Sequence, residues 1–168
     1  VNARALELAA LTAALNGADV DLRAGSLYEP VAGERFDLIV SNPPFVMSPP
    51  RAEADTLAYR EANFEADALV ETLVRGAADH LAPGGSLQLL TNWAVLDQPW
   101  EERLRGWVPD GCDAWVIERE RLDVFSYIEM WLADAGLAGR PGWRAAYDEG
   151  LAYFDRLGIR SGGMGWVL

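Results

Sequence analysis

Four consecutive residues, Asn42-Pro43-Pro44-Phe45, combine side chains and backbone groups that could bind and orient a nitrogen nucleophile. The side-chain oxygen of Asn42 and a neighbouring backbone carbonyl are two hydrogen-bond acceptors on one turn, which suits an NH2 group with two donors. Each proline fixes its own φ angle, and Pro44 also restricts Pro43, so the turn is stiff. Phe45 offers a flat aromatic face to a planar group.

An amide or an exocyclic amine is a poor nucleophile because its lone pair is delocalised. Two acceptors that hold both hydrogens out of the plane would turn that lone pair toward an electrophile, which combines orientation with preorganised electrostatics. This chemistry needs no histidine, cysteine or metal, and the chain contains one His and one Cys. The motif therefore predicts a metal-free site that activates a nitrogen; the alternative interpretation is a turn that only ends a strand.

The motif directly follows residues 36–40, an apolar run in which only Asp37 is charged. A run that is apolar on both faces is typical of a strand covered by helices on both sides. Because proline cannot continue a central ladder, the strand should end at the motif. The motif would then lie at the carboxyl edge of a parallel sheet, where open α/β folds bind their ligands.

The remaining elements predict the rest of this fold. Apolar spacing and turn residues predict helices at 2–17, 66–81, 99–107 and 123–135 and around 147–157, and strands at 20–24, 86–91, 112–118 and 163–168. Strands joined through helices predict an α/β fold that is Rossmann-like, with a mostly parallel sheet, helices on both faces and a final antiparallel strand. Because the chain starts with a helix, the first strands are expected to be missing.

Charge and hydropathy narrow the function classes. The net charge is −12, which argues against holding a long nucleic acid by phosphate neutralisation. No run approaches the roughly 18 apolar residues of a membrane span. No basic-then-apolar leader is present, so a cytoplasmic location is expected. His80 lies at the end of a predicted helix, where a structural role is typical.

The stretch IVSNPPF resembles the end of the fourth strand in class I S-adenosylmethionine-dependent methyltransferases that modify nitrogen, which reads (Asp/Asn)-Pro-Pro-aromatic. VNARALELAALTAALNG is similar to the segment after their second strand, RAGSLYEP to the loop along the cofactor adenine, and DHLAPGGSLQLL to the helix, turn and fifth strand. GIRSGGMGWVL is similar, more weakly, to the return from the sixth to the seventh strand. Residues 1–168 would then be the C-terminal major part of one methyltransferase catalytic domain.

The resemblance implies a role for each residue of the motif. Asn42 and Pro43 would accept hydrogen bonds from the target nitrogen, Pro44 would stiffen the turn, and Phe45 would stack on or pack against the planar substrate.

The resemblance also implies S-adenosylmethionine as the cofactor, contacted by Val1, Ser26, Leu27 and Asn42. Ser26 stands where aspartate is frequent, which weakens the expected contact to the adenine amino group. The Gly-rich loop and the ribose-binding acid would lie upstream of Val1. The chain alone is therefore expected to bind the cofactor weakly or not at all.

The nitrogen that is modified has several candidates. A protein glutamine, as in release-factor enzymes, is favoured by the acidic charge and by residues 56–77, which resemble the helix after the motif in those enzymes. An RNA or DNA base (adenine N6 or guanine N2) is the alternative, and a non-catalytic binding module is a third. Expected partners are a protein substrate such as a translation release factor, or RNA, and no membrane. Expected substrate contacts at the carboxyl edge are Val46, Tyr59, Arg60 and Trp93.

Overall fold

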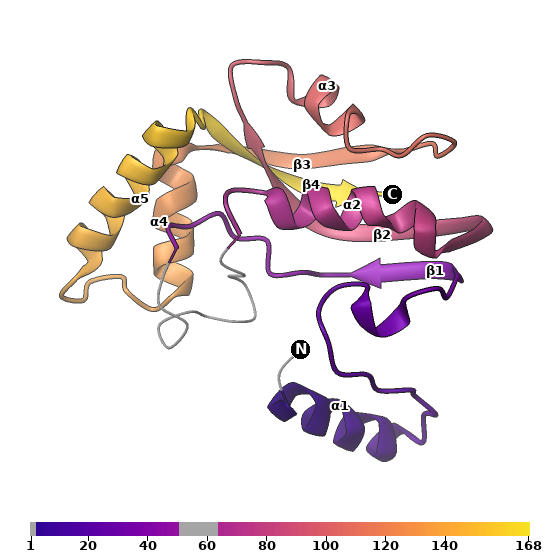
Figure 1. Cartoon of the computed structure of the whole chain (residues 1–168). Coiled ribbons are helices and arrows are strands. Elements are labelled where there is room, and N and C mark those ends of the chain that lie inside the picture. Colours follow the sequence, from indigo (N-terminus) through magenta and orange to yellow (C-terminus); the bar gives the residue numbers. More distant parts are fainter. Residues whose placement is uncertain (1–2, 51–63) are drawn as a thin grey trace.

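The computed structural model describes residues 3–50 and 64–168 (Figure 1). The helices are α1 (Ala3–Asn16), η1 (Glu29–Val31, a 3-10 helix), α2 (Ala68–His80), α3 (Trp100–Arg105), α4 (Val124–Asp134) and α5 (Trp143–Leu157). The strands are β1 (Phe36–Ser41), β2 (Leu81–Val95), β3 (Val116–Asp123) and β4 (Ser161–Val167). Helices and strands alternate along most of the chain, which confirms the predicted α/β class.

The sheet has the order β1-β2-β4-β3. β1 pairs with β2 in parallel, and β4 pairs antiparallel with both β2 and β3. β1, β2 and β3 therefore point one way and only β4 opposes them. The mostly parallel sheet with a final antiparallel strand is confirmed.

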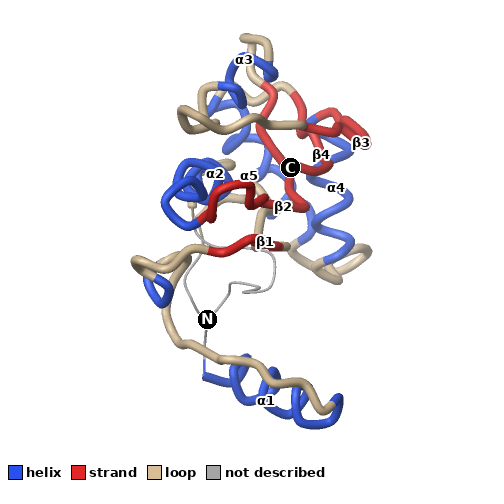
Figure 2. The backbone as a smooth tube through the Cα atoms, turned by 90° about the vertical axis from the view of Figure 1, so that its right-hand side faces the viewer, coloured by secondary structure: helices blue, strands red, loops and turns tan. Residues whose placement is uncertain are grey.

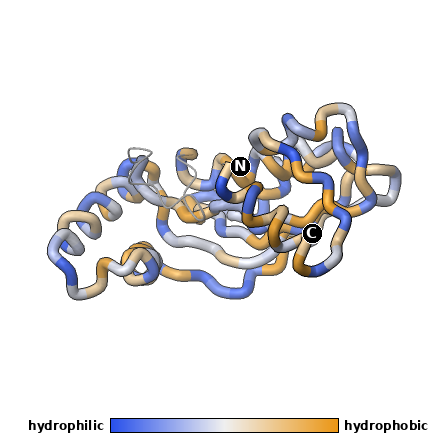
Figure 3. The backbone as a smooth tube through the Cα atoms, turned by 90° about the horizontal axis from the view of Figure 1, so that it is seen from below, coloured by the Kyte–Doolittle hydropathy of each residue, from blue (hydrophilic) through white to orange (hydrophobic). Residues whose placement is uncertain are grey.

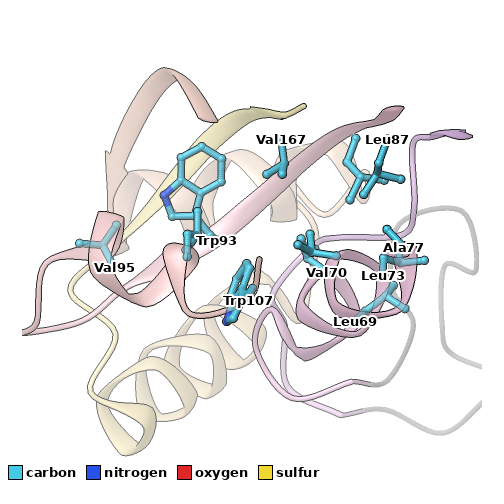
Figure 4. Close-up of a cluster of buried hydrophobic side chains, with 12 residues drawn as sticks. Leu69, Val70, Leu73, Ala77, Leu87, Trp93, Val95, Trp107 and Val167 are labelled. Carbon is cyan, nitrogen blue, oxygen red and sulfur yellow. The ribbon is translucent and has the colours of Figure 1, made fainter. Parts of the chain in front are cut away.

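Helices pack on both faces of the sheet. Successive residues of β2 point to opposite sides, so neighbouring residues of this strand contact different helices. Trp93 and Val95 belong to a core cluster with α2 and α3, in which Figure 4 shows Val70, Leu73 and Trp107. Ala94, between them in sequence, belongs to a second cluster with α4 and α5. The carboxyl end of β2 is therefore packed from both sides.

Three predicted strands differ clearly from the structure, and one of them is β2, which spans Leu81–Val95 and not 86–91. Residues 20–24 are irregular, and Val20 and Leu22 are exposed, because no described strand lies beside the outer edge of β1 to pair with them. The strand predicted at 112–118 begins only at Val116 and continues to Asp123. Its run of charged residues is not typical of a strand, but β3 is an outer strand of the sheet, where charged side chains reach water.

α1 stands apart from the sheet and buries no residue (Figure 2). Most of its residues are apolar (Figure 3), and Leu8, Leu11 and Leu15 are exposed. Leu38 and Val40 on β1 are also exposed, at 53% and 67%. This side of the fold therefore presents unpaired apolar surface. Among the described helices, none is long and apolar enough to cross a membrane.

Candidate active site

The motif lies where the sequence places it, directly after β1. β1 ends at Ser41, and no described strand continues through the prolines. Pro43 is buried, whereas Asn42 is exposed and its side chain makes no hydrogen bond to another described residue. In Figure 1 the carboxyl end of β1 points toward α4 and α5. The acceptor of Asn42 is therefore available at the sheet edge where α/β folds bind ligands.

One open cavity of about 890 Å³ joins the motif to the loop predicted to contact the cofactor. Ser26 and Leu27 line it from one side, and Asn42, Pro43 and Pro44 line it from the other. Its wall continues along β1, with apolar side chains at Leu38, Ile39 and Val40. The cavity has the size of a small-molecule site and a largely apolar wall that suits a planar base.

The loop before η1 holds a constrained backbone at this cavity. Leu27 has φ +48°, a left-handed conformation that costs a non-glycine residue about 1 kcal/mol. Gly25 has φ +148°, and a Cβ there would overlap the ring of Pro30. A turn closes the loop, because Glu29 N donates to Ser26 O at 3.0 Å. The surrounding structure therefore fixes Ser26 and Leu27 against the cavity.

Tyr28 anchors this loop to α2, which sequence reasoning missed. Its hydroxyl donates to Leu73 O at 2.8 Å, and its ring stacks on His80 with centroids 4.5 Å apart. Burial raises the pKa of Tyr28 above its ordinary value. Gly76 gives the ring room, since a Cβ there would lie 2.8 Å from Tyr28 Cε2. A glycine inside a helical pattern was the available signal, and the stacking agrees with a structural role for His80.

Charged residues at the cavity pair with each other. Arg23 contacts Asp21 at 2.6 Å, bonds to Glu34, and donates to Pro30 O at 3.1 Å. The hydrogen bond to Glu34 is the main cause of the raised pKa of Arg23. These contacts tie the segment before the loop to the segment after η1. Within residues 3–50 and 64–168, no group of three or more His, Cys, Asp or Glu could hold a metal ion.

The aromatic residue of the motif does not line this cavity. Phe45 is half-buried, packs against the core cluster of α2, and meets the edge of Trp131 with ring centroids 6.2 Å apart. Its contact with a planar substrate stays a prediction. Phe64, which is 41% exposed, is an aromatic residue that does line the cavity. No pattern in the sequence singled out this residue.

The four expected substrate contacts have different outcomes in the structure. Trp93 is not in an edge loop: β2 runs on to Val95, and the indole is 0% exposed and stacks on Trp100 at 5.2 Å. That expectation was wrong, because the strand is longer than its apolar run suggested. Val46 is only 7% exposed and borders a void of about 30 Å³ beside α4. Tyr59 and Arg60, like the expected cofactor contact Val1, lie outside the described residues.

Comparison with known families decides the class of the protein. The profile of the family described as "Methyltransferase small domain" matches residues 1–104, which include the motif, the parallel pair β1 and β2, and the loop at Ser26. The chain belongs to this methyltransferase family.

Curated relatives divide between two activities. A release factor glutamine methyltransferase of Xylella fastidiosa (strain Temecula1) is 38% identical over 109 residues, which cover 60% of this chain and 37% of the relative. A ribosomal RNA small subunit methyltransferase C of Enterobacter sp. (strain 638) is 39% identical over 99 residues, which cover 59% of this chain and 24% of the relative. A release factor glutamine methyltransferase of Geobacter sulfurreducens is 37% identical over 95 residues, or 51% and 32%. The matched part thus spans well under half the length of each relative.

Proposed function

We propose that this methyltransferase uses S-adenosylmethionine to methylate an amide or amine nitrogen held by Asn42 and the backbone of Pro43. The observation that carries the proposal is the shared cavity, which brings the loop at Ser26 and Leu27 to the motif across an apolar wall. When bound, S-adenosylmethionine supplies an electrophilic methyl group. Ser26 and Leu27 would hold its adenine, and the apolar wall that includes Leu38 would suit a planar base.

The side chain of Asn42 and the carbonyl of Pro43 act as the two acceptors for the target NH2 group. Asn42 is exposed and makes no hydrogen bond to a described residue, so its oxygen can accept from a substrate. Two fixed acceptors orient the nitrogen lone pair, and neither needs a proton or a metal to do so. Catalysis by this site is positioning and electrostatics.

We also propose that residues 1–168 form the C-terminal major part of one catalytic domain. The exposed apolar side chains of Leu38 and Val40 on β1 and the exposed stripe of α1 support this, because apolar surface of this kind normally packs against further structure. Further strands beside β1 would cover it. They would carry the glycine-rich loop and the acidic residue that complete the cofactor site.

The favoured substrate is a protein glutamine of the release-factor type. The net charge of −12 supports a protein over a long nucleic acid, and two of the relatives above are named as glutamine methyltransferases. A nucleic acid base is the second candidate, and the match to the ribosomal RNA enzyme supports it. A binding module without catalysis would leave the exposed acceptor of Asn42 without a use.

The test uses the complete protein, including the segments upstream of this chain, with labelled S-adenosylmethionine and an undermethylated cell extract. Label that protease releases supports the glutamine proposal, label that ribonuclease releases supports a base, and no label supports the binding module. Asn42→Ala should lower turnover about 100-fold, the usual loss for one oriented stabilising contact. Asn16→Ala is the matched control, since Asn16 is exposed at the end of α1 and bonds only to Thr12 O among the described residues. Equal turnover for both variants would show that something else holds the nitrogen.

A further inference from the structure

The phenol of Tyr127 on α4 connects the chain just after the motif to the end of a neighbouring strand. Its oxygen accepts a hydrogen bond from Met47 N at 3.1 Å and from Asn92 Nδ2 at 3.0 Å. Tyr127 is 1% exposed, and Met47 and Asn92 are 2% and 1% exposed. Water therefore cannot replace the phenol oxygen as the acceptor for these two donors.

A second residue of α4 contacts the motif from the same helix. Trp131 lies one turn after Tyr127, and its indole meets Phe45 edge to face with centroids 6.2 Å apart. The two aromatic side chains also contact each other at 6.2 Å. Residues four apart lie on the same face of a helix. One face of α4 thus holds the last residue of the motif and the residue two positions after it.

The surrounding structure is shaped around this tyrosine. A Cβ at Gly162 of β4 would lie 2.5 Å from Tyr127 Cδ2 and 2.7 Å from Cε2, so only glycine lets the ring lie flat against the strand. Phe154 of α5 packs on the other side with centroids 5.5 Å apart. The ring is fixed by packing, and its hydroxyl therefore has a fixed position too.

The amide of Asn92 depends on the same bond. Its oxygen has no partner among the described residues, so the bond from Nδ2 to Tyr127 is the contact that orients this buried side chain. Asn92 lies on β2, which is the strand paired in parallel with β1. The phenol thus sets the motif loop relative to the adjacent carboxyl end of the sheet.

We propose that Tyr127 is a positioning residue for methyl transfer to the target nitrogen: its hydroxyl fixes Met47 and thereby the orientation of the Asn42-Pro43-Pro44-Phe45 turn. The proposal rests on the proposed function, because it assigns a task within that site. Tyr127 does not line the cavity with Asn42. It acts through the backbone of the loop.

Removing the hydroxyl of Tyr127 distinguishes a residue that positions the motif from one that only stabilises the fold. Tyr127→Phe keeps the ring packing and removes the hydroxyl oxygen that accepts from Met47 and Asn92. If the bond positions the motif, the loop gains freedom and the reacting nitrogen is misplaced, which lowers kcat by about 10- to 100-fold. The KM for S-adenosylmethionine should change less than kcat, because the loop at Ser26 is held by Tyr28 and not by α4, and only Asn42 of the expected cofactor contacts lies in the turn.

Tyr153 on α5 provides a matched control. Its hydroxyl also accepts from a backbone N–H, that of Ala66 at 2.8 Å, and burial raises its pKa as it does that of Tyr127. Ala66 lies two residues before α2 and does not line the cavity with Asn42. Tyr153→Phe therefore removes the same kind of bond without touching the motif, and kcat should stay within about 2-fold of the unchanged protein.

The first measurement is amide hydrogen exchange of both variants, and the second is steady-state kinetics of the complete protein. Tyr127→Phe should speed exchange of the Met47 amide by about 10-fold, since one net hydrogen bond is lost, and Tyr153→Phe should leave that amide unchanged. Unchanged exchange at Met47 in Tyr127→Phe, or an equal kcat for the two variants, would overturn the proposal. An unchanged protein that transfers no methyl group would refute the proposed function instead, and the exchange result would still decide whether Tyr127 fixes the loop.

Discussion

A buried ion pair between Asp67 and Arg103 holds the carboxyl end of β2, and substitution of Arg103 tests how much this pair contributes to stability. Arg103 Nη1 donates to Asp67 Oδ1 at 3.2 Å, and Nη2 bonds to Oδ2 of the same carboxylate and to Ala94 O at 2.6 Å. Asp67 Oδ2 also accepts from Ala94 N at 2.7 Å. The side chains are only 6% and 14% exposed. The pair thus connects the start of α2, helix α3 and the carboxyl end of β2.

Arg103→Met should lower the free energy of unfolding by about 3 kcal/mol. Removing one partner of a buried pair costs about 3–5 kcal/mol, because the other charge stays buried without compensation. The low end applies here, since Asp67 keeps the bond from Ala94 N and the site is not fully closed. The lost stacking of Arg103 over Trp107, at 4.8 Å, adds to the loss.

Urea unfolding followed by tryptophan fluorescence measures this change. Asp67→Asn in the Arg103→Met background should recover part of the loss, because it removes the stranded charge and keeps an acceptor for Ala94 N. Arg160→Met is the control: its pair with Asp97 has side chains 60% and 80% exposed, so the urea midpoint should not move. A loss below about 1 kcal/mol for Arg103→Met would refute the reasoning from burial. A double variant less stable than Arg103→Met alone would refute it as well.

Three further predictions concern β4, the isolated chain and pH. Gly162→Ala should cost about 1–3 kcal/mol in urea unfolding, because its Cβ would overlap the ring of Tyr127; an unchanged midpoint would contradict the packing described. Residues 1–168 alone should give no micromolar binding of S-adenosylmethionine by calorimetry, and such binding would refute the expected upstream half of the cofactor site. Burial raises the pKa of Tyr127 from 10.0 to about 12. The unfolded chain then loses this proton first, so stability should fall as pH rises from 10 to about 12. Tyr127→Phe should reduce that fall in urea unfolding at each pH.

Local pattern was enough where one strand and one turn decide the structure. The positions of β1 and the motif were predictable because an apolar run followed by two prolines indicates a strand that stops. The expected cover on both faces of that strand is not observed, since Leu38 and Val40 are exposed. α4 was predictable from its apolar spacing, with Asp123 as N-cap accepting from Ser126 N at 2.9 Å and Gly136 ending the helix at φ +72°. These features need no knowledge of distant residues.

Features that depend on a distant partner were not predictable from the sequence. A strand at 20–24 requires a neighbouring strand, and β1 has none on that side among the described residues. Trp93 was expected in a loop, but pairing with β4 extends β2 to Val95 and buries the indole. The direction of Phe45 depends on Trp131, which is 86 positions later in the chain. Tertiary contacts, and not local propensity, decide each of these positions.

The place of β4 in the sheet sets an order of assembly during synthesis. β4 is the last described strand, yet it lies between β2 and β3, which do not pair with each other. A nascent chain that stops before Ser161 therefore leaves β3 and α4 without a route into the sheet, and Tyr127 lacks the strand that receives its ring. Loss of residues 161–168 would separate the described sheet into two parts instead of shortening it. An interrupted translation product would carry the whole Asn-Pro-Pro-Phe motif but not the structure that orients it.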